Sequence, residues 1–91
     1  MLALNSIPSI NRHFRLQWEP AQGAYVLLYP EGMVKLNPSA SEVLNVCDGK
    51  TDIAGIISAL DKKFPEAGGV SADVIDFLED AHGKHWIEFQ Q

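Results

Sequence analysis

Residues 14–36, FRLQWEPAQGAYVLLYPEGMVKL, contain three short apolar runs separated by two turn-forming segments. Apolar and polar residues alternate along residues 14–18, and this period of two is typical of a strand with one buried face. Residues 19–23 and 30–32 contain proline and glycine, which favour turns between strands. The stretch therefore predicts a three-stranded antiparallel meander, with strands at residues 14–18, 25–29 and 33–36.

The third predicted strand separates its side chains clearly into two faces. Val34 and Leu36 can point into the core, while Met33 and Lys35 point to solvent. Because this strand is the last of the meander, it forms an edge of the sheet unless the C-terminal segment covers it. On the first strand, the alternation predicts Trp18 in the core or at its margin.

After the meander the apolar period lengthens from two residues to 3.6, the period of helices. Ser39 and Glu42 have the S-x-x-E spacing of a capping box, so a first helix is predicted over residues 40–47. Gly49 can adopt the left-handed conformation that ends a helix, and Thr51 is predicted to cap a second one. The apolar stripe of this second helix consists of Ile53, Ile56, Ile57, Leu60 and Phe64.

A third helix is predicted after the break at Pro65 and residues 68–69. It begins near Ser71 and ends at Gly83. Its buried stripe consists of Val74, Phe77, Leu78 and Ala81. The last apolar segment, residues 86–89, is compatible either with a short strand or with packing of its aromatic rings on the sheet.

Together these elements predict an α+β fold that is winged helix-turn-helix-like: an N-terminal three-stranded antiparallel meander is followed by a three-helix bundle. At 91 residues the chain is expected to form a single domain, residues 1–91, with residues 1–11 as a candidate flexible N-terminal tail. A domain of this size buries only about two-thirds of the surface of its unfolded chain, so no deep catalytic cavity is expected.

The charge balance argues against nucleic acid and anionic membranes as partners. Seven Lys plus Arg and twelve Asp plus Glu give a formal net charge of −5, which repels polyanions. The third predicted helix occupies the DNA-recognition position of a winged helix-turn-helix, yet it has no Lys or Arg before Lys84. Its acidic residues are Asp73, Asp76, Glu79 and Asp80.

Cysteine usage and the N-terminus favour the cytoplasm. The single cysteine, Cys47, cannot form an intramolecular disulfide and fits a reducing compartment. Residues 1–14 lack the basic start and long apolar run of a signal peptide. No stretch approaches the roughly 18 apolar residues of a membrane span.

Few residues could carry chemistry. Cys47 lies at a predicted helix C-terminus beside Asp48, and both surroundings disfavour a thiolate, so a packed core cysteine is expected. His82 and His85, even with Asp80, supply fewer than the four ligands of a structural metal site. Asp48 and other acids near the corner are explained by capping, so we predict neither a catalytic nor a metal-binding residue.

Several motifs, in this order, resemble the pyrroloquinoline quinone biosynthesis protein D (PqqD) family. They are WEPAQGAYVLLYPEGMVKLN at residues 18–37, SEVLNVCDGKT at 41–51, I-x-x-I-I-x-x-L at 53–60 and DVIDFL at 73–78. The resemblance covers about residues 8 to 89. One departure lies near the C-terminus: the family commonly has a leucine, a polar pair and a glycine before the last aromatic-apolar pair, where this chain has AHGKH.

The resemblance implies a non-catalytic peptide chaperone without a cofactor of its own, the stand-alone form of a recognition domain for ribosomally made peptides. Members of the family bind a short precursor peptide and present it to a radical S-adenosylmethionine (SAM) enzyme, which joins a glutamate and a tyrosine of that peptide. The iron-sulfur chemistry belongs to that enzyme.

An exposed edge strand can accept an extended peptide as an additional strand, which makes this function physically plausible. We therefore predict that the peptide lies between the third strand and the third helix. The predicted peptide-binding residues are Met33, Val34, Lys35, Leu36, Asp73, Asp76, Phe77 and Asp80. In the alternative interpretation, Phe77 belongs wholly to the core and the acidic residues only solvate a helix face.

Two other function classes stay open. The chain could organise the radical SAM enzyme as an interaction subunit that does not itself bind peptide, or it could be a winged-helix DNA-binding regulator, which the charge disfavours. The exposed edge could also pair two copies of the chain, so neither a monomer nor a homodimer is preferred.

Overall fold

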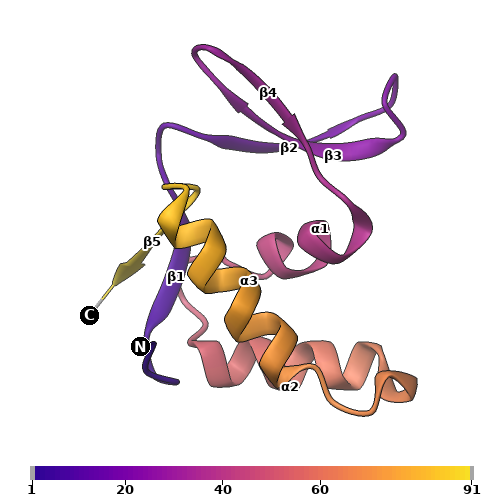
Figure 1. Cartoon of the computed structure of the whole chain (residues 1–91), viewed down its shortest axis with the longest axis vertical. Helices are drawn as coiled ribbons and strands as arrows, with labels where there is room; N and C mark the ends of the chain where they lie inside the picture. Colours follow the sequence, from indigo (N-terminus) through magenta and orange to yellow (C-terminus); the bar gives the residue numbers. More distant parts are fainter. Residues whose placement is uncertain (1, 91) are drawn as a thin grey trace.

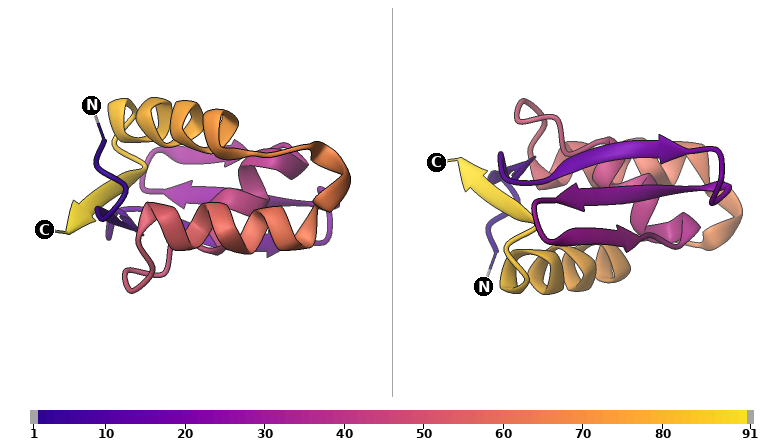
Figure 2. Two further views of the ribbon diagram at one scale, coloured as in Figure 1. Left: turned by 90° about the horizontal axis from the view of Figure 1, so that it is seen from below. Right: turned by 90° about the horizontal axis from the view of Figure 1, so that it is seen from above.

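The structure is a computed structural model that describes residues 2–90. Its elements follow the order β1 (Ile7–Ile10), β2 (Arg15–Glu19), β3 (Ala24–Tyr29), β4 (Gly32–Lys35), α1 (Pro38–Asn45), α2 (Ile53–Lys63), the 3-10 helix η1 (Pro65–Ala67), α3 (Ser71–Gly83) and β5 (Ile87–Gln90). The sheet of β2, β3 and β4 forms one layer, and the helices pack against one of its faces (Figures 1 and 2). The predicted α+β fold is confirmed.

The meander is antiparallel with strand order β2-β3-β4, as predicted. Leu27, at the centre of β3, lies opposite Leu16 on one side and Val34 on the other. These three side chains share the face that packs on the helices, and Leu27 is fully buried there. Met33 and Lys35 are exposed, as their position in the alternation predicts.

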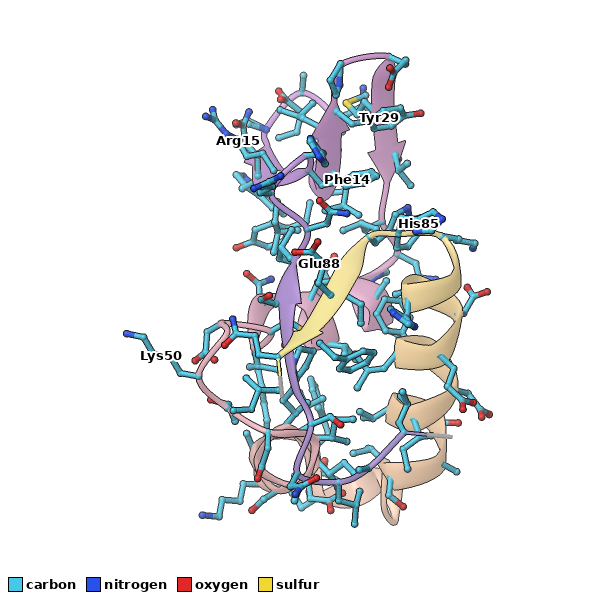
Figure 3. The ribbon with its side chains drawn as sticks, turned by 90° about the vertical axis from the view of Figure 1, so that its left-hand side faces the viewer. Phe14, Arg15, Tyr29, Lys50, His85 and Glu88 are labelled. Carbon is cyan, nitrogen blue, oxygen red and sulfur yellow. The ribbon has the colours of Figure 1, made fainter. Side chains whose placement is uncertain are left out.

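The prediction of a flexible tail over residues 1–11 is wrong for residues 7–10. They form β1, which pairs antiparallel with β5 so that Ile7 lies opposite Gln90 and Ile10 opposite Ile87. Figure 3 shows the two strands side by side, with Glu88 labelled on β5. The C-terminal segment is thus a strand, and its partner is β1 rather than the meander. Among residues 2–90, β3 is the strand that pairs with β4, and the outer edge of β4 stays free.

Both predicted helix caps are displaced by one or two residues. The cap of α1 is Asn37, whose side-chain oxygen accepts a hydrogen bond from the Ala40 amide at 2.8 Å, rather than Ser39. Pro38 then occupies the first turn, where its fixed φ fits the helix and its missing N–H costs nothing. Helix α1 consequently starts two residues earlier than predicted and ends at Asn45 rather than at residue 47.

The N-terminus of α2 is satisfied from two directions. Asp52, not Thr51, is its cap, and its carboxylate accepts from the Gly55 amide at 2.8 Å. The first two amides of the helix, those of Ile53 and Ala54, donate to the carbonyls of Ser6 and Leu4, both at 3.0 Å. The N-terminal segment therefore completes the hydrogen bonding of α2, in addition to pairing with β5.

The core lies between the meander and the helices, with contributions from α1, α2, α3 and β5. Its most deeply buried members include Leu27, Leu44, Ile53, Ile56, Leu78 and Ile87. Two aromatic predictions are corrected. Trp18 is 51% exposed because it lies near the end of β2, beyond the cover of the helices, and Phe64 is 37% exposed because α2 ends at that residue. In residues 2–90 no helix has the length and apolar character needed to cross a bilayer.

The identity of the α1 cap can be tested by stability measurements. We expect Asn37→Ala to lower the free energy of unfolding by about 1 kcal/mol, because an orphan helix amide loses its acceptor. Ser39→Ala, the matched control, should change it by less than about 0.5 kcal/mol, as for an ordinary surface position. Urea unfolding followed by circular dichroism measures both, and a larger loss for Ser39→Ala would contradict the assignment.

Candidate functional site

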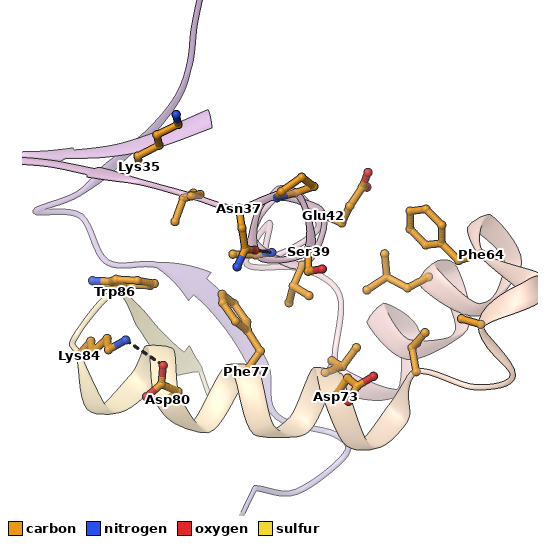
Figure 4. A pocket seen from close by; sticks show the side chains of 18 residues that line it. Lys35, Asn37, Ser39, Glu42, Phe64, Asp73, Phe77, Asp80, Lys84 and Trp86 are labelled. Atoms are coloured by element: carbon orange, nitrogen blue, oxygen red, sulfur yellow. Dashed lines mark hydrogen bonds and ion pairs between the residues drawn. The ribbon is translucent and has the colours of Figure 1, made fainter. Parts of the chain in front are cut away.

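An open groove of about 630 Å³ runs between the β4–α1 junction and α3 (Figure 4). One wall is formed by residues 35–40 with Glu42 and Val43, and the other by residues of α3 with Lys84 and Trp86. Leu60, Phe64, Ala67 and Val70 line the end near α2 and η1. The groove thus lies between the two elements that were predicted to hold a peptide.

Helix α3 turns one stripe of side chains toward the groove. Asp73, Phe77, Asp80 and Lys84 follow one another at intervals of three or four residues, which places them on the same helix face. The neighbouring stripe, which includes Leu78, is directed into the core. Within the groove stripe, Phe77 lies on the side nearest the core, so it is half-buried and part of its ring is available to a ligand.

Trp86 and Lys84 form the end of the groove nearest β4. The Lys84 ammonium lies 3.0 Å from Asp80 and 4.9 Å from the centroid of the Trp86 ring. The Trp86 backbone is fixed because its amide donates to the Ala81 carbonyl at 2.9 Å. The ion pair is exposed and contributes little to stability, but it sets the position of the ammonium beside the indole.

The free edge of β4 carries backbone groups that face outward. In an antiparallel ladder, residues that exchange hydrogen bonds with the neighbouring strand alternate with residues that do not. Leu36 donates its amide to the Tyr25 carbonyl at 3.0 Å, so Leu36 and Val34 direct their backbone groups toward β3. Met33 and Lys35 therefore direct their N–H and C=O groups away from the sheet, where a further strand could pair with them.

The structure brings five of the eight predicted binding residues to the groove: Lys35, Leu36, Asp73, Phe77 and Asp80. Met33 is 44% exposed and lies nearer the tip of the β3–β4 hairpin. The side chain of Val34 packs against the core. Asp76 neighbours Asp73 and Asp80 on α3 but does not line the groove, because it is exposed on the side of the stripe that is turned away from the core.

Sequence reasoning missed other lining residues, chiefly Asn37, Pro38, Ser39, Glu42, Phe64, Lys84 and Trp86. Lys84 could have been found by extending the α3 stripe by one turn beyond Asp80. Phe64 and Trp86 gave a weaker signal, because an aromatic residue at the end of an element is equally compatible with the core.

The groove has an apolar floor and a rim with charges of both signs. Leu36, Val43, Leu60 and Val74 are buried beneath it. Lys35 and Lys84 bring positive charge to the rim, while Asp73 and Glu42 bring negative charge. Glu42 also pairs with Lys63 of α2 at 2.6 Å. Such a surface suits an amphipathic peptide rather than a uniformly charged polymer.

Cys47 is a core residue, as predicted. It is buried in the helical core, and its Sγ donates to the Val43 carbonyl at 3.3 Å. Burial, helped by the nearby Asp48 carboxylate, raises the pKa of the Cys47 thiol to about 12. At neutral pH the group stays a thiol and is not a nucleophile.

The acidic corner after Cys47 is structural. The exposed Asp48 carboxylate accepts from the Lys50 and Thr51 amides, both at 2.9 Å, and these hydrogen bonds lower its pKa.

His82 packs its ring against Phe89, with centroids 4.9 Å apart. Within the described part of the chain, no three His, Cys, Asp or Glu residues lie close enough together to hold a metal ion.

Comparison with known proteins gives consistent matches. Residues 24–87 match the family described as coenzyme PQQ synthesis protein D (PqqD). The chain is 54% identical over 88 residues to the PqqA binding protein of Pseudomonas paraeruginosa, covering 97% of this chain and 96% of the relative. It is 56% identical over 85 residues to the PqqA binding protein of Azotobacter vinelandii, covering 93% and 92% of the two chains.

Among solved structures, the chain is similar to the solution NMR structure of the PqqD truncation of Methylobacterium extorquens PqqCD. That protein is described as a functional and stand-alone recognition element for ribosomally synthesized and post-translationally modified peptides. The TM-score is 0.75 at 25% sequence identity, and the match covers 97% of this chain and 95% of the other.

The raised pKa of Cys47 predicts slow reaction with thiol reagents. At pH 8 in the folded protein, we expect a disulfide reagent such as Ellman's reagent to modify Cys47 at least about 100-fold more slowly than in the urea-unfolded chain, because the folded thiol is both buried and protonated. The free energy of unfolding should also fall as the pH rises from about 9 toward 12, since the unfolded thiol ionises first. Rapid modification of folded protein would contradict this description.

Proposed function

The chain belongs to the PqqD family, and from that membership and the groove we propose that it is a non-catalytic peptide chaperone of pyrroloquinoline quinone biosynthesis. It binds the precursor peptide PqqA by adding the peptide as a strand to β4, with the peptide side chains directed into the groove beside α3. The observation that carries this proposal is the free β4 edge, whose last residue, Lys35, lines the same groove as the half-buried ring of Phe77.

Backbone pairing alone is too weak to hold a peptide. Met33 and Lys35 together offer four outward groups, and each hydrogen bond contributes about 1 kcal/mol net. Association and ordering of a flexible peptide cost at least about 4 kcal/mol, which cancels that gain. The affinity must therefore come from apolar side chains that enter the groove and contact residues such as Phe77 and Trp86.

The partner that modifies the peptide is, in our proposal, a radical SAM enzyme of the same pathway, acting in the cytoplasm. A strand that pairs with β4 along one side keeps its other side unpaired. It also directs alternate side chains away from the groove. The bound peptide would thus remain accessible to a second protein, and the complex can present it without carrying out the reaction.

Binding measurements distinguish three other interpretations from this one. A subunit that only organises the enzyme would bind the enzyme equally well with and without PqqA. A DNA-binding regulator would bind duplex DNA with an affinity that falls steeply with salt. A homodimer formed through β4 would lose its dimeric mass when PqqA occupies the edge.

Strand addition predicts that Lys35→Pro abolishes most PqqA binding. The substitution removes an outward N–H and places a ring on the pairing edge, so we expect the affinity for synthetic PqqA to fall about tenfold or more. The fold should persist because this N–H does not bond to β3. Isothermal titration calorimetry gives the affinity, and circular dichroism verifies the fold.

Lys35→Ala is the matched control for that variant. It removes the same side chain but keeps the backbone N–H, so its affinity should stay within about threefold of the original protein, the loss expected for one exposed charge. Equal effects of the proline and alanine variants in folded protein would assign the role to the Lys35 ammonium and contradict strand addition.

The groove predicts a second contrast on α3, between Phe77→Ala and Ile75→Ala. Both residues are half-buried and apolar, but Phe77 lines the groove and Ile75 does not. We expect each substitution to cost about 1–3 kcal/mol of stability. Of the two variants, only Phe77→Ala should weaken PqqA binding, by about tenfold, through loss of apolar contact area.

The two α3 variants are compared at a temperature where both are folded, by calorimetric titration with PqqA. If Ile75→Ala weakens binding as much as Phe77→Ala, the effect is one of stability. The groove would then not be the PqqA site.

A further inference from the structure

A second cleft of about 420 Å³ lies on the other side of the β4–α1 junction from the groove. Its walls come from the end of the sheet and from the outer face of α1, and the residues used below are Trp18, Tyr25, Asn37, Pro38, Glu42 and Asn45. Cavities of this size are in the range that holds small ligands or a few side chains of a larger one.

An exposed indole is the main feature of this cleft. Trp18 is held edge-on against Tyr25, with ring centroids 5.2 Å apart and planes at 69°, yet half of its surface is open to solvent. An aromatic side chain that is fixed on one side and open on the other is typical of binding surfaces. Opposite it, the Asn45 amide nitrogen donates to the Ser41 carbonyl at 2.8 Å, which leaves the Asn45 amide oxygen to accept from a ligand.

The cleft adjoins the groove. Both are lined by residues 35–38 and by Glu42, so they share one wall. The bond from the Leu36 amide to the Tyr25 carbonyl lies at the end of the β3–β4 ladder, and the backbone then turns at Asn37 into α1. A peptide that pairs with β4 therefore runs off the sheet at this shared wall, beside the entrance to the cleft.

We infer that the cleft is a second subsite for the same peptide, which binds an apolar or aromatic side chain against Trp18 and a backbone N–H at Asn45. This inference rests on the proposed binding of PqqA in the groove. A peptide held at β4 already lies against residues 35–38, so the same peptide can continue into the cleft without a second association cost, which a separate protein would have to meet.

The two tryptophans of the chain report separately on the two sites, because Trp86 lines the groove and Trp18 lines the cleft. In Trp18→Phe the emission comes from Trp86, and in Trp86→Phe it comes from Trp18. Titration of each variant with synthetic PqqA should change both emissions, with the midpoints following the affinity of each variant measured by calorimetry.

Truncated peptides locate the second contact. PqqA is shortened from either end in turn, and one of the two series should lose the Trp18 response while it keeps the Trp86 response, with about tenfold weaker binding. The variant Trp18→Ala should bind full-length PqqA with an affinity lowered by a similar factor, as measured by calorimetry. Its matched control is Leu4→Ala, because Leu4 is 53% exposed and lines neither site, and it should leave the affinity unchanged.

Other outcomes overturn specific parts of this account. A response of Trp86 without one of Trp18, together with unchanged affinity of Trp18→Ala, removes the cleft and leaves the proposed function intact. A Trp18 response that appears only when the radical SAM enzyme is added assigns the cleft to the enzyme. Absence of PqqA binding in calorimetry for the unsubstituted protein removes both the proposed function and this inference.

Discussion

The junction at Asn37 is the constraint on which the rest of the structure depends. Its side chain caps α1 through the Ala40 amide, and the next residue, Pro38, fixes the first turn of the helix. The residue before it, Leu36, is still bonded to β3. Within three residues the chain therefore changes from sheet edge to helix with little rotational freedom, and this change sets the angle between β4 and the helical layer. The groove and the second cleft lie on the two sides of this junction.

A free sheet edge is normally a liability, because it can pair with any exposed strand. Two features limit that risk here. β4 has only four residues, with the charged Lys35 on it, so it offers a short template. The C-terminal strand, which could have covered the edge, pairs instead with β1 on another part of the molecule. The edge is thus kept open but short, which favours a partner that adds side-chain contacts in the groove over one that offers backbone pairing alone.

The sequence predicted those elements whose signal is local. The meander and the stripes of α2 and α3 follow from periods of two and 3.6 residues, which nearby residues determine. The predictions failed where the deciding partner was distant or where two local signals competed. Strand β1 was missed because its partner lies about 80 residues away, at Gln90. The α1 cap was misplaced because Asn37-Pro38 and the S-x-x-E pattern at Ser39 are both valid start signals, and the first allows a longer helix. Asp76 was grouped with Asp73 and Asp80 because intervals of three and four residues place the three carboxylates side by side on α3, and only the structure shows that Asp76 does not line the groove; its role in peptide binding stays a prediction.

The length of the groove face of α3 explains why the groove alone contacts only a short peptide segment. From Asp73 to Lys84 the helix rises about 16 Å at 1.5 Å per residue, and an extended peptide covers that length with about five residues. Because alternate side chains of a strand point to opposite faces, only two or three of those five can enter the groove. The charges at the rim can order these few side chains. Because the contacts are few, the apolar area they bury leaves little binding free energy after the cost of association and ordering. A continuous peptide that also reaches Trp18 would gain a further buried side chain without a second association cost, since it is already held at β4. The shared wall at residues 35–38 is what makes that gain available to a domain with such a modest core.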